Sequence, residues 1–295
     1  MKIFVIFNPA SHKAKKKSDE FLRALDLLGE KNDLVLLETS KPGDGKPLAE
    51  RAVREGADIV VAAGGDGTLH EVVNGAAGTE TAVGVLPLGI TNVFALDARI
   101  PIDVIEAAKL ILKGKPRAVD LGKADGEYFI LMLGAGLDAY AVHKLNLKAK
   151  KALGKGSYIL SGFTNYLSYR PSKIRVVLKD LDLDLQGYHV IIANAASYGG
   201  RFKISPEARW DDGLLDICVF QKRGPYNDFR YFLGVLNSRH SKYPDVVIVK
   251  SAEIHLEGDG VYYHLDSEPV GILPIHVKAV HGAVKIILPD LQSDL

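Results

Sequence analysis

The sequence has 295 residues, with 37 lysines and arginines against 36 aspartates and glutamates, and its formal net charge is +1 at pH 7. This balance excludes the strongly basic surface that favours nucleic acid, and no nucleic-acid partner is expected. Hydrophobic residues make up 47% of the chain and charged residues 25%, as in globular proteins. The length favours two ordinary domains over one large domain. The single cysteine, Cys218, excludes an internal disulfide and fits a reducing compartment.

The sequence contains no stretch that predicts a membrane-spanning helix. The apolar run at residues 3–7 is too short for a signal peptide and predicts a first buried strand. The uncharged span Thr81–Leu96 is too short to cross a bilayer and is interrupted by glycines and a proline. We therefore expect a cytoplasmic protein whose contact with membranes, if any, is peripheral.

The first part of the chain alternates short apolar runs with amphipathic ones. This alternation, with short connections, predicts an open and mostly parallel α/β sheet over residues 1–124. Ligands bind such sheets at the carboxyl ends of strands, which is where Asn8–Ser11 and Gly64–Thr68 fall. The expected strands are residues 3–7, 34–37, 59–63 and 81–86, and the expected helices include residues 48–55 and 103–113.

One stretch of this part has the features of an anion site. The apolar run Ile59–Ala63 is followed at once by Gly64-Gly65-Asp66-Gly67-Thr68. Thr68 and Glu71 have the spacing of a capping box, which predicts the start of a helix. Glycines let a ligand approach the backbone, and the free N–H groups of a helix start favour phosphate. A nucleotide phosphate with Mg²⁺ is expected here, and a tight turn without a ligand is the alternative.

This motif resembles the Gly-Gly-Asp-Gly-Thr motif shared by diacylglycerol kinase-like lipid kinases, NAD kinases and, more distantly, phosphofructokinases. Residues Pro87–Ala95 resemble the lipid-kinase stretch Pro-x-Gly-Thr-x-Asn-Asp/Val-Phe/Leu-Ala, with Ile90 in place of the first threonine. An NAD kinase is expected to have a Gly-x-x-Gly-Phe-Leu type segment there. The resemblance implies that the nucleotide is bound by Asn8, Ser11, Gly64, Gly65, Asp66, Gly67, Thr68, Thr91 and Asn92.

From residue 125 onward the pattern is mainly that of strands. Short, regularly spaced apolar runs, interrupted by one helix at about residues 227–238, predict an antiparallel β-sandwich over residues 125–295. The resemblance implies that this domain binds the lipid, and the extreme C-terminus is allowed to pack back on the first domain. The expected strands are residues 174–179, 181–185, 189–194, 214–220, 246–250, 252–256, 261–265, 275–280 and 284–288.

Two acidic motifs in the second half also resemble lipid kinases. Residues 206–216 resemble Pro-x-Ala-x-x-x-Asp-Gly-x-Leu-Asp, which implies a structural Mg²⁺ on Asp212, although Asp-Asp-Gly alone predicts a hairpin turn. Residues 266–268 resemble an Asp-Gly-Glu motif, with Ser267 in place of the glycine. The resemblance implies that Asp266 is the general base of phosphoryl transfer, and that Glu268 and Asp66 help to organise Mg²⁺. Residues 134–139 and 194–200 also resemble family segments near the cleft.

A cluster of lysines precedes an apolar and aromatic stretch, Tyr158–Leu167. This combination favours peripheral membrane contact, because lysines suit anionic headgroups and aromatic rings suit the interface. A core helix with a solvated approach explains the pattern equally well, so both interpretations stay open. The lysines are Lys144, Lys148, Lys150, Lys151 and Lys155.

Taken in order from Asn8 to Asp266, the motifs cover nearly the whole chain, which is therefore similar to diacylglycerol kinase-like lipid kinases. The resemblance implies transfer of the γ-phosphoryl group of ATP, with Mg²⁺, to the hydroxyl of a lipid alcohol. An NAD kinase is one alternative. A non-catalytic nucleotide- or lipid-binding relative is another, because His12, Ile90 and Ser267 depart from the family pattern. The lipid and the oligomeric state stay undecided, although free sheet edges would allow a homodimer.

Overall fold

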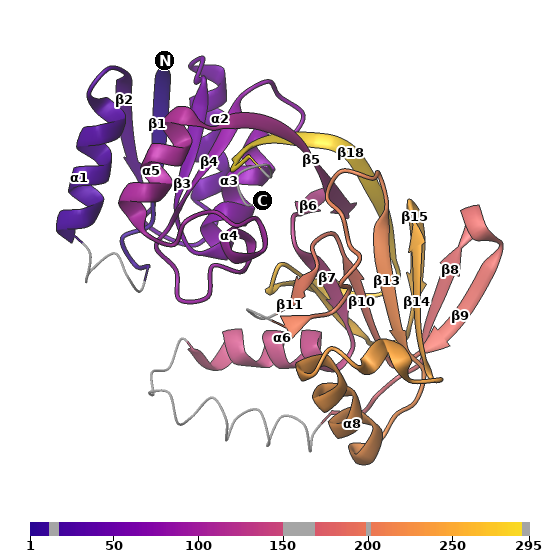
Figure 1. Cartoon of the computed structure of the whole chain (residues 1–295). Coiled ribbons are helices and arrows are strands. Elements are labelled where there is room, and N and C mark those ends of the chain that lie inside the picture. The colour runs from indigo at the N-terminus through magenta and orange to yellow at the C-terminus, as the bar shows by residue number, and fades with distance from the viewer. Residues whose placement is uncertain (12–17, 150–168, 199–201, 291–295) are drawn as a thin grey trace.

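A computed structural model describes residues 1–11, 18–149, 169–198 and 202–290, with the backbone alone for residues 18 and 145–149. The chain forms an α/β part and a β-rich part that lie side by side (Figure 1). A ten-stranded sheet runs through both parts, and a six-stranded sheet lies in the second part. The predicted fold class, an α/β domain followed by an antiparallel β-sandwich, is confirmed.

The α/β part has the parallel sheet that the alternating pattern predicts. Its strands pair in the order β2-β1-β3-β4, all parallel, and β3 and β4 are buried along their whole length. Helix α1 packs with α5, and α2 packs with α3. The strands are β1 (Lys2–Phe7), β2 (Asp33–Glu38), β3 (Ile59–Gly64) and β4 (Ala82–Pro87), and the helices are α1 (Ser18–Gly29), α2 (Gly45–Arg54), α3 (Asp66–Ala76), α4 (Val93–Asp97) and α5 (Val104–Lys113).

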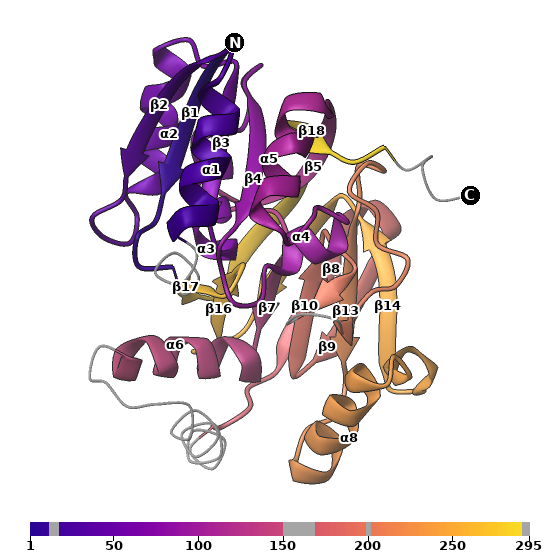
Figure 2. The ribbon, with the colours of Figure 1, turned by 60° about the vertical axis from the view of Figure 1, so that its left-hand side comes forward.

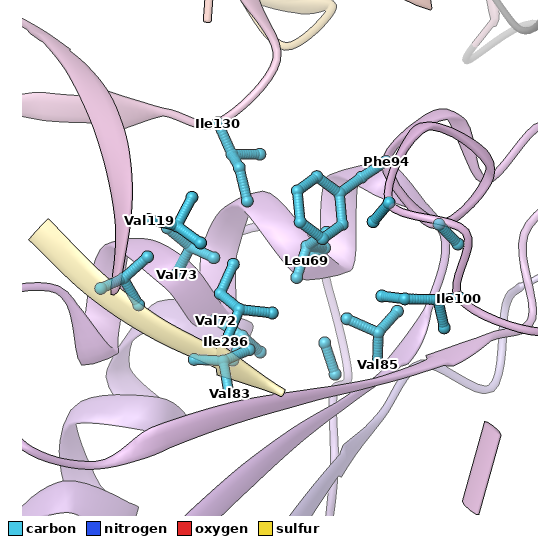
Figure 3. Packing of buried hydrophobic residues seen from close by; sticks show 14 of the residues in the cluster. Leu69, Val72, Val73, Val83, Val85, Phe94, Ile100, Val119, Ile130 and Ile286 are labelled. Atoms are coloured by element: carbon cyan, nitrogen blue, oxygen red, sulfur yellow. The ribbon is translucent and has the colours of Figure 1, made fainter. Parts of the chain in front are cut away.

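Helix α3 is held against the sheet by its apolar face. Leu69, Val72 and Val73 are buried beside Val83 and Val85 of β4 (Figure 3). Burying one such side chain stabilises the fold by about 1.5–3 kcal/mol. The packing therefore fixes the direction in which the first turn of α3, and the glycine motif before it, face the solvent.

The predicted capping box at the start of α3 is wrong. The helix begins at Asp66, with Gly65 at the N-cap position and no side-chain cap. The Thr68 hydroxyl instead accepts a hydrogen bond from Asn8 Nδ2, at 3.2 Å. The Glu71 carboxylate accepts the N–H group of Gly43, in the loop before α2, at 2.8 Å, and that of Gly45, the first residue of α2, at 2.6 Å. Both side chains thus connect α3 to neighbouring loops rather than to its own first turn.

The second part is a sandwich whose two sheets share one core. One layer is the six-stranded sheet, and the other is the β15, β8 and β9 end of the ten-stranded sheet. The six-stranded sheet contains β7 (Met132–Ala135), β10 (His189–Ala193), β13 (Leu215–Phe220), β14 (Val246–Ser251), β16 (Tyr262–Leu265) and β17 (Glu268–Ile272). The remaining elements are β6 (Glu127–Phe129), α6 (Leu137–Ala149), β8 (Ile174–Leu178), β9 (Leu183–Gly187), β11 (Ser197–Tyr198), β12 (Phe202–Lys203), α8 (Pro225–Leu236), β15 (Glu253–Glu257) and short 3₁₀ turns at Lys179–Leu181 and His240–Lys242.

Strand β18 (Ile275–Leu288) joins the two parts. It pairs with β15 and, along most of its length, with β5 (Lys115–Ala124), and its second half also pairs parallel with β4. The sequence predicts two strands here, 275–280 and 284–288, but the structure has one strand with a register shift between Val280 and Val284. The end of the described chain therefore lies in the sheet of the α/β part. The domain boundary at residues 124/125 stays a prediction.

Candidate active site

The carboxyl ends of the parallel strands surround a cavity of about 550 Å³. Asn8 and Ser11 line it after β1, and Thr39, Ser40 and Lys41 line it after β2. Sequence reasoning missed the β2 residues, although the rule that selects Asn8 at the end of β1 applies to them equally. Gly65, Gly67 and Thr68 of the predicted nucleotide set also line this cavity. We refer to it as the nucleotide-side cavity.

Close packing explains why glycine, and no larger residue, stands at two positions of this region. A Cβ on Gly64 would lie 2.2 Å from Thr68 Oγ1, and a Cβ on Gly89 would lie 2.6 Å from the Cα of Gly65. Both distances are shorter than real Cβ contacts, so a side chain at either position would push the motif apart. Gly64 therefore acts by giving room to Thr68, and Gly89 lets the loop after β4 touch the loop after β3.

Asp66 links the glycine motif to the start of α4. Its Oδ1 accepts the Phe94 N–H at 3.1 Å, and its Oδ2 accepts the Val93 N–H at 3.0 Å and the Thr91 hydroxyl at 3.2 Å. Burial raises the pKa of Asp66, although these donors act in the opposite direction. One lone pair of Oδ1 is left for a further ligand.

Asn92 faces the interior of its own loop. Its Oδ1 accepts the Gly89 N–H at 2.9 Å, and its Nδ2 donates to the carbonyls of Gly89 and Pro87 at 3.2 and 3.4 Å. The residue is 3% exposed and has a positive φ of 47°. Asn92 thus shapes the loop between β4 and α4, and its direct contact with nucleotide stays a prediction.

A second cavity, of about 490 Å³, lies between the two parts of the molecule. Asp66, Gly67 and Thr91 line it from the α/β part, and residues 266–268 line it from the β-rich part. Its remaining wall is largely apolar, and consists of Val93, Leu131, Met132, Ala141, Val142 and Tyr198 together with Asp138 and His264. We refer to it as the acceptor-side cavity.

The two cavities meet at Gly67 and Glu268, which line both of them. Glu268 Oε1 lies 3.3 Å from the position that a Cβ on Gly67 would occupy, so the carboxylate rests directly on the glycine motif. No hydrogen bond to this carboxylate is formed by the described residues. Desolvation raises the pKa of Glu268, the charge of His70 acts in the opposite direction, and the nearby charges of Glu71 and Asp266 raise the pKa again. Glu268 is thus a carboxylate at the junction of the cavities that accepts no hydrogen bond from the described residues.

Asp266 is placed very differently from Glu268. Its side chain is 0% exposed, and both oxygens are saturated with hydrogen bonds. Oδ1 accepts the N–H groups of Leu131 and Met132 at 2.8 and 2.9 Å, and Oδ2 accepts the Ile130 N–H at 2.9 Å. The ring of His70 completes the set, with Nδ1 2.9 Å from Oδ2. Asp266 therefore connects the β16–β17 turn, the β6–β7 connection and α3.

His70 is a functional candidate that sequence reasoning missed. It lies on the buried side of α3, where its spacing is that of an ordinary core position. Burial alone would lower its pKa, but the hydrogen bond with Asp266 and the charges of Asp266, Glu127 and Glu268 outweigh burial, and the pKa is raised. When protonated, the ring supplies a positive charge beside Asp266, which lines the acceptor-side cavity.

The raised pKa of His70 predicts how stability depends on pH. Its stabilising contribution is complete below the ordinary histidine pKa of 6.5 and is lost as pH rises through the higher folded-state value. We expect the free energy of unfolding, measured by urea titration, to fall across this range. The fall is expected to disappear in His70→Gln and to persist in His276→Gln, which changes an exposed histidine of β18. An unchanged pH profile in His70→Gln would contradict the assignment.

The turn that carries Asp266 is a two-residue hairpin loop. Leu265 pairs with Glu268 across it, so Asp266 and Ser267 alone connect β16 to β17. Their φ angles are 48° and 69°, as a type I′ turn requires at both central positions. Asp-Gly is favoured in such turns, which explains why glycine is the family residue at position 267. Strand β17 itself was not predicted, because its Glu-Pro-Val-Gly-Ile sequence has a weak strand pattern.

Ser267→Gly is expected to stabilise the protein. A non-glycine residue in the left-handed region costs about 1–2 kcal/mol, and glycine removes most of that cost. The expected result is an increase of about 1 kcal/mol in the free energy of unfolding. Ser267→Ala serves as the control, since it removes the hydroxyl and keeps the strain. An equal increase in both variants would show that the hydroxyl, and not the backbone, is responsible.

A second acid–histidine pair lines the acceptor-side cavity. His264 Nδ1 accepts the Ser267 N–H at 3.2 Å, so Nε2 carries the ring hydrogen and donates to Asp138 Oδ2, also at 3.2 Å. Burial alone would raise the pKa of Asp138, but this hydrogen bond lowers it. A Cβ on Gly134 would lie 2.2 Å from Asp138 Oδ2, which explains why the turn at residues 134–139 needs that glycine.

Both parts of the chain match models of known families. Residues 2–124 match the diacylglycerol kinase catalytic domain. Residues 132–288, more than half of the chain, match the YegS C-terminal NAD kinase beta sandwich-like domain. The chain belongs to the diacylglycerol kinase-like family.

Relatives of this family align along almost the whole chain. A diacylglycerol kinase of Bacillus subtilis (strain 168) is 28% identical over 298 residues, covering 98% of this chain and 97% of the relative. A diacylglycerol kinase of Staphylococcus aureus (strain Newman) is also 28% identical, over 291 residues, covering 97% and 92%. The chain is therefore a kinase by family.

Solved structures agree with the fold. A diacylglycerol kinase from Bacillus anthracis str. Sterne superposes with a TM-score of 0.73 at 21% identity, covering 98% of this chain and 97% of that chain. An NAD kinase from Archaeoglobus fulgidus in complex with ATP superposes with a TM-score of 0.50 at 9% identity, covering 97% and 93%. These likenesses show a fold shared by this family and NAD kinases.

The structural Mg²⁺ that the family resemblance implies at Asp212 does not fit the contacts of that residue. Asp212 Oδ2 lies 2.7 Å from Lys250 Nζ, and Oδ1 accepts the Leu214 N–H at 3.1 Å. Lys250 Nζ also lies 3.4 Å from Asp216 Oδ2. Burial alone would lower the pKa of Lys250, but these acids raise it, so the ammonium stays charged. A lysine thus supplies the positive charge at this turn, and Mg²⁺ on Asp212 stays a prediction that the contacts disfavour.

Other predicted features fall partly or wholly outside the described residues. Asn194 is buried and donates to the carbonyls of Asp120 and Ile130 at 2.8 and 2.9 Å, whereas Gly199 and Gly200 are not described. Of the predicted basic cluster, Lys144 lies over the Tyr140 ring at 5.5 Å, and the other four lysine side chains and residues 158–167 are outside the described part. Within the described residues, no helix is both long and apolar enough to cross a bilayer.

Proposed function

We propose that this kinase transfers the γ-phosphoryl group of ATP to the hydroxyl of a lipid alcohol of the diacylglycerol type. The observation that carries the proposal is the meeting of the nucleotide-side and acceptor-side cavities at Gly67 and Glu268. Phosphoryl transfer requires two substrates in line across a water-poor junction, with a carboxylate beside the attacking hydroxyl. The two cavities provide one compartment for each substrate.

The nucleotide-side cavity suits ATP. Strand ends and the N-terminus of α3 supply backbone N–H groups, and Thr68, Ser40 and Lys41 add hydroxyl and ammonium donors. When bound, Mg²⁺ neutralises charge on the transferred phosphoryl group. The free Oδ1 lone pair of Asp66, whose pKa is raised by burial, fits such a cation. The described residues contain no cluster of three acids, histidines or cysteines arranged for a metal, which agrees with a Mg²⁺ held by few carboxylates and by phosphates.

The acceptor-side cavity suits a hydroxyl on a greasy body. Glu268 and Asp66 are among its polar lining residues, and Leu131, Met132 and Val142 form part of an apolar wall. An NAD kinase must bind the dinucleotide NAD⁺ as its acceptor, and this apolar wall provides few polar partners for one. The wall therefore favours a lipid alcohol over NAD⁺.

We propose different roles for the two acids of the 266–268 motif. Glu268 accepts the hydroxyl proton while the alcohol oxygen attacks the γ-phosphorus, and ADP leaves with the electron pair of the broken P–O bond. Asp266, predicted from the family as the base, has no free lone pair unless it gives up a hydrogen bond. Asp266 is therefore proposed as the positioning residue that holds the turn carrying Glu268.

The test is release of ADP from MgATP with a panel of micellar lipid alcohols, namely diacylglycerol, a sphingoid base, an isoprenoid alcohol and phosphatidylglycerol. NAD⁺ is included as the competing acceptor. ADP release that depends on a lipid and is absent with NAD⁺ is the expected result. Release with NAD⁺ alone would replace the proposal by NAD kinase activity. ATP binding without turnover of any acceptor would favour a non-catalytic relative.

A further inference from the structure

The turn before β13 surrounds one ammonium group with oxygen atoms. Lys250 Nζ lies 2.7 Å from Asp212 Oδ2 and 3.4 Å from Asp216 Oδ2. It also donates to the carbonyl oxygen of Glu207 at 3.2 Å. A lysine ammonium has three N–H groups, so these three oxygens account for all of them. Two carboxylates and a backbone carbonyl are also the kind of ligands that Mg²⁺ and Ca²⁺ use in proteins.

The lysine reaches this turn from a neighbouring strand. Lys250 belongs to β14, and the strand register places it directly opposite Asp216 of β13. The two strands lie side by side in Figure 2. Asp212 is 38 positions away along the chain. The turn itself keeps the residues of the family motif, so the motif alone does not reveal which cation the turn holds. That choice depends on residue 250 of another strand.

Further contacts hold both carboxylates around Nζ. Asp212 Oδ1 accepts the Leu214 N–H at 3.1 Å, and Asp216 Oδ1 accepts the Ser205 hydroxyl at 2.6 Å. Each acid thus has one oxygen bound within the segment before β13 and one oxygen directed at Nζ. A divalent cation needs such oxygens at about 2.0–2.6 Å. It would therefore have to take the position of Nζ, and the two cations exclude each other.

We infer that Lys250 is a covalently attached replacement for the divalent cation that the family motif implies at this turn. The ammonium supplies the positive charge between Asp212 and Asp216, and a chelator cannot remove it. The turn is then held without metal, and any Mg²⁺ that the proposed reaction requires acts with the nucleotide. This replacement is a property of the fold and does not depend on which acceptor is phosphorylated.

Removal of the lysine is expected to create a metal site. Lys250→Met keeps an unbranched side chain and removes the ammonium, which leaves two carboxylates and a carbonyl free to bind a cation. Without metal, this variant is expected to lose about tenfold or more in the folding equilibrium constant, because hydrogen bonds between charged groups are lost. Mg²⁺ or Ca²⁺ is expected to restore most of the loss, since a ligand that binds only the folded state stabilises it.

The first experiment measures urea unfolding of the full-length protein without nucleotide. Unfolding is compared in EDTA and in Mg²⁺ or Ca²⁺ at about 10 mM and constant ionic strength. The metal is expected to stabilise Lys250→Met about tenfold more than the wild type, and Lys250→Met/Asp212→Asn is expected to lose this gain. A cation bound elsewhere stabilises all variants equally and cancels in the comparison. The matched control, Lys278→Met, breaks a cross-strand ion pair with Glu253 and is expected to respond to metal like the wild type.

The second experiment detects a bound metal directly. Trp210, the only tryptophan of the chain, lies two positions from Asp212 and can sensitise the luminescence of a Tb³⁺ ion bound nearby. Tb³⁺ replaces Ca²⁺ at oxygen sites. Lys250→Met is expected to give tryptophan-sensitised Tb³⁺ emission that Ca²⁺ reverses and that the added Asp212→Asn substitution abolishes. The wild type is expected to give no emission that depends on Asp212.

The wild type decides the inference even if Lys250→Met is too unstable to purify. Wild-type stability that rises with Mg²⁺ or Ca²⁺, or wild-type Tb³⁺ emission, would overturn the inference if Asp212→Asn abolishes it, because a metal then binds at the turn. A Lys250→Met variant that is as stable as the wild type in EDTA, or that neither cation restores, would overturn it as well. None of these measurements involves turnover, so a failure of the proposed kinase activity leaves their results unchanged.

Discussion

Asp266→Asn is expected to reduce turnover and stability together. The asparagine NH₂ group must face either the Leu131 and Met132 N–H groups or His70 and the Ile130 N–H, which leaves at least one buried N–H group without an acceptor. Such a loss costs about 1–3 kcal/mol of the free energy of unfolding. The displaced turn would move Glu268, and a displacement of about 1 Å can slow catalysis about a hundredfold. Urea titration and steady-state kinetics measure the two effects.

The pH dependence of turnover distinguishes positioning from base catalysis. If Asp266 holds the turn, its variant is slower at every pH but keeps the acidic limb of the wild-type profile. Disappearance of that limb in Asp266→Asn, with normal stability, would instead assign the base to Asp266. Asp259→Asn, an exposed acid in the turn between β15 and β16, is the matched control for the loss of one carboxylate and is expected to change neither quantity.

Glu268→Gln is expected to lower kcat by about a hundredfold to ten-thousandfold, which is the range for loss of a general base. Stability is expected to be unchanged, because no described residue forms a hydrogen bond with this carboxylate. Nucleotide binding, measured by calorimetry, is expected to persist, since the other residues of the nucleotide-side cavity are intact. Glu30→Gln, at an exposed position after α1, is the control.

Glu268→Gln is also expected to change the dependence of kcat/KM on pH. The pKa of Glu268 is raised above the ordinary value of 4.5, and a base must be ionised to act. Wild-type kcat/KM is therefore expected to fall as pH drops through this raised pKa, and the fall is expected to be absent in Glu268→Gln. A variant that keeps both wild-type kcat and the acidic limb would remove Glu268 from the reaction.

The local sequence pattern was sufficient to predict much of the fold. The buried runs of β3 and β4, and the glycine motif between β3 and α3, are encoded in neighbouring residues, so their type and order could be predicted. The position of Asn8 and Gly64 at the same sheet edge followed from the rule that parallel strands end together. What these local rules do not provide is the set of partners that each side chain finds across the chain.

Several of the errors and omissions involve distant partners. Thr68 and Glu71 have the spacing of a capping box. Their side chains instead accept hydrogen bonds from Asn8 and from the N–H groups of Gly43 and Gly45. His70 has the spacing of a core residue, and only the Asp266 carboxylate, 196 positions away, makes it an electrostatic element of the site. Strand β18 likewise depends on pairing with remote strands, whereas β17 pairs with its neighbour β16 and was missed because of its own weak strand pattern.

Strand β18 has a consequence for how the protein is made. It is synthesised after every other described strand, yet it lies in the middle of the ten-stranded sheet, between β4 and β15. Until it leaves the ribosome, β4 has an unpaired edge beside the nucleotide motif, and such an edge invites association with other chains. The sheet of the α/β part is therefore complete only after β18 has been synthesised. A premature stop before Ile275 would remove the strand that pairs with both β4 and β15, and with it the continuous sheet that joins the two parts.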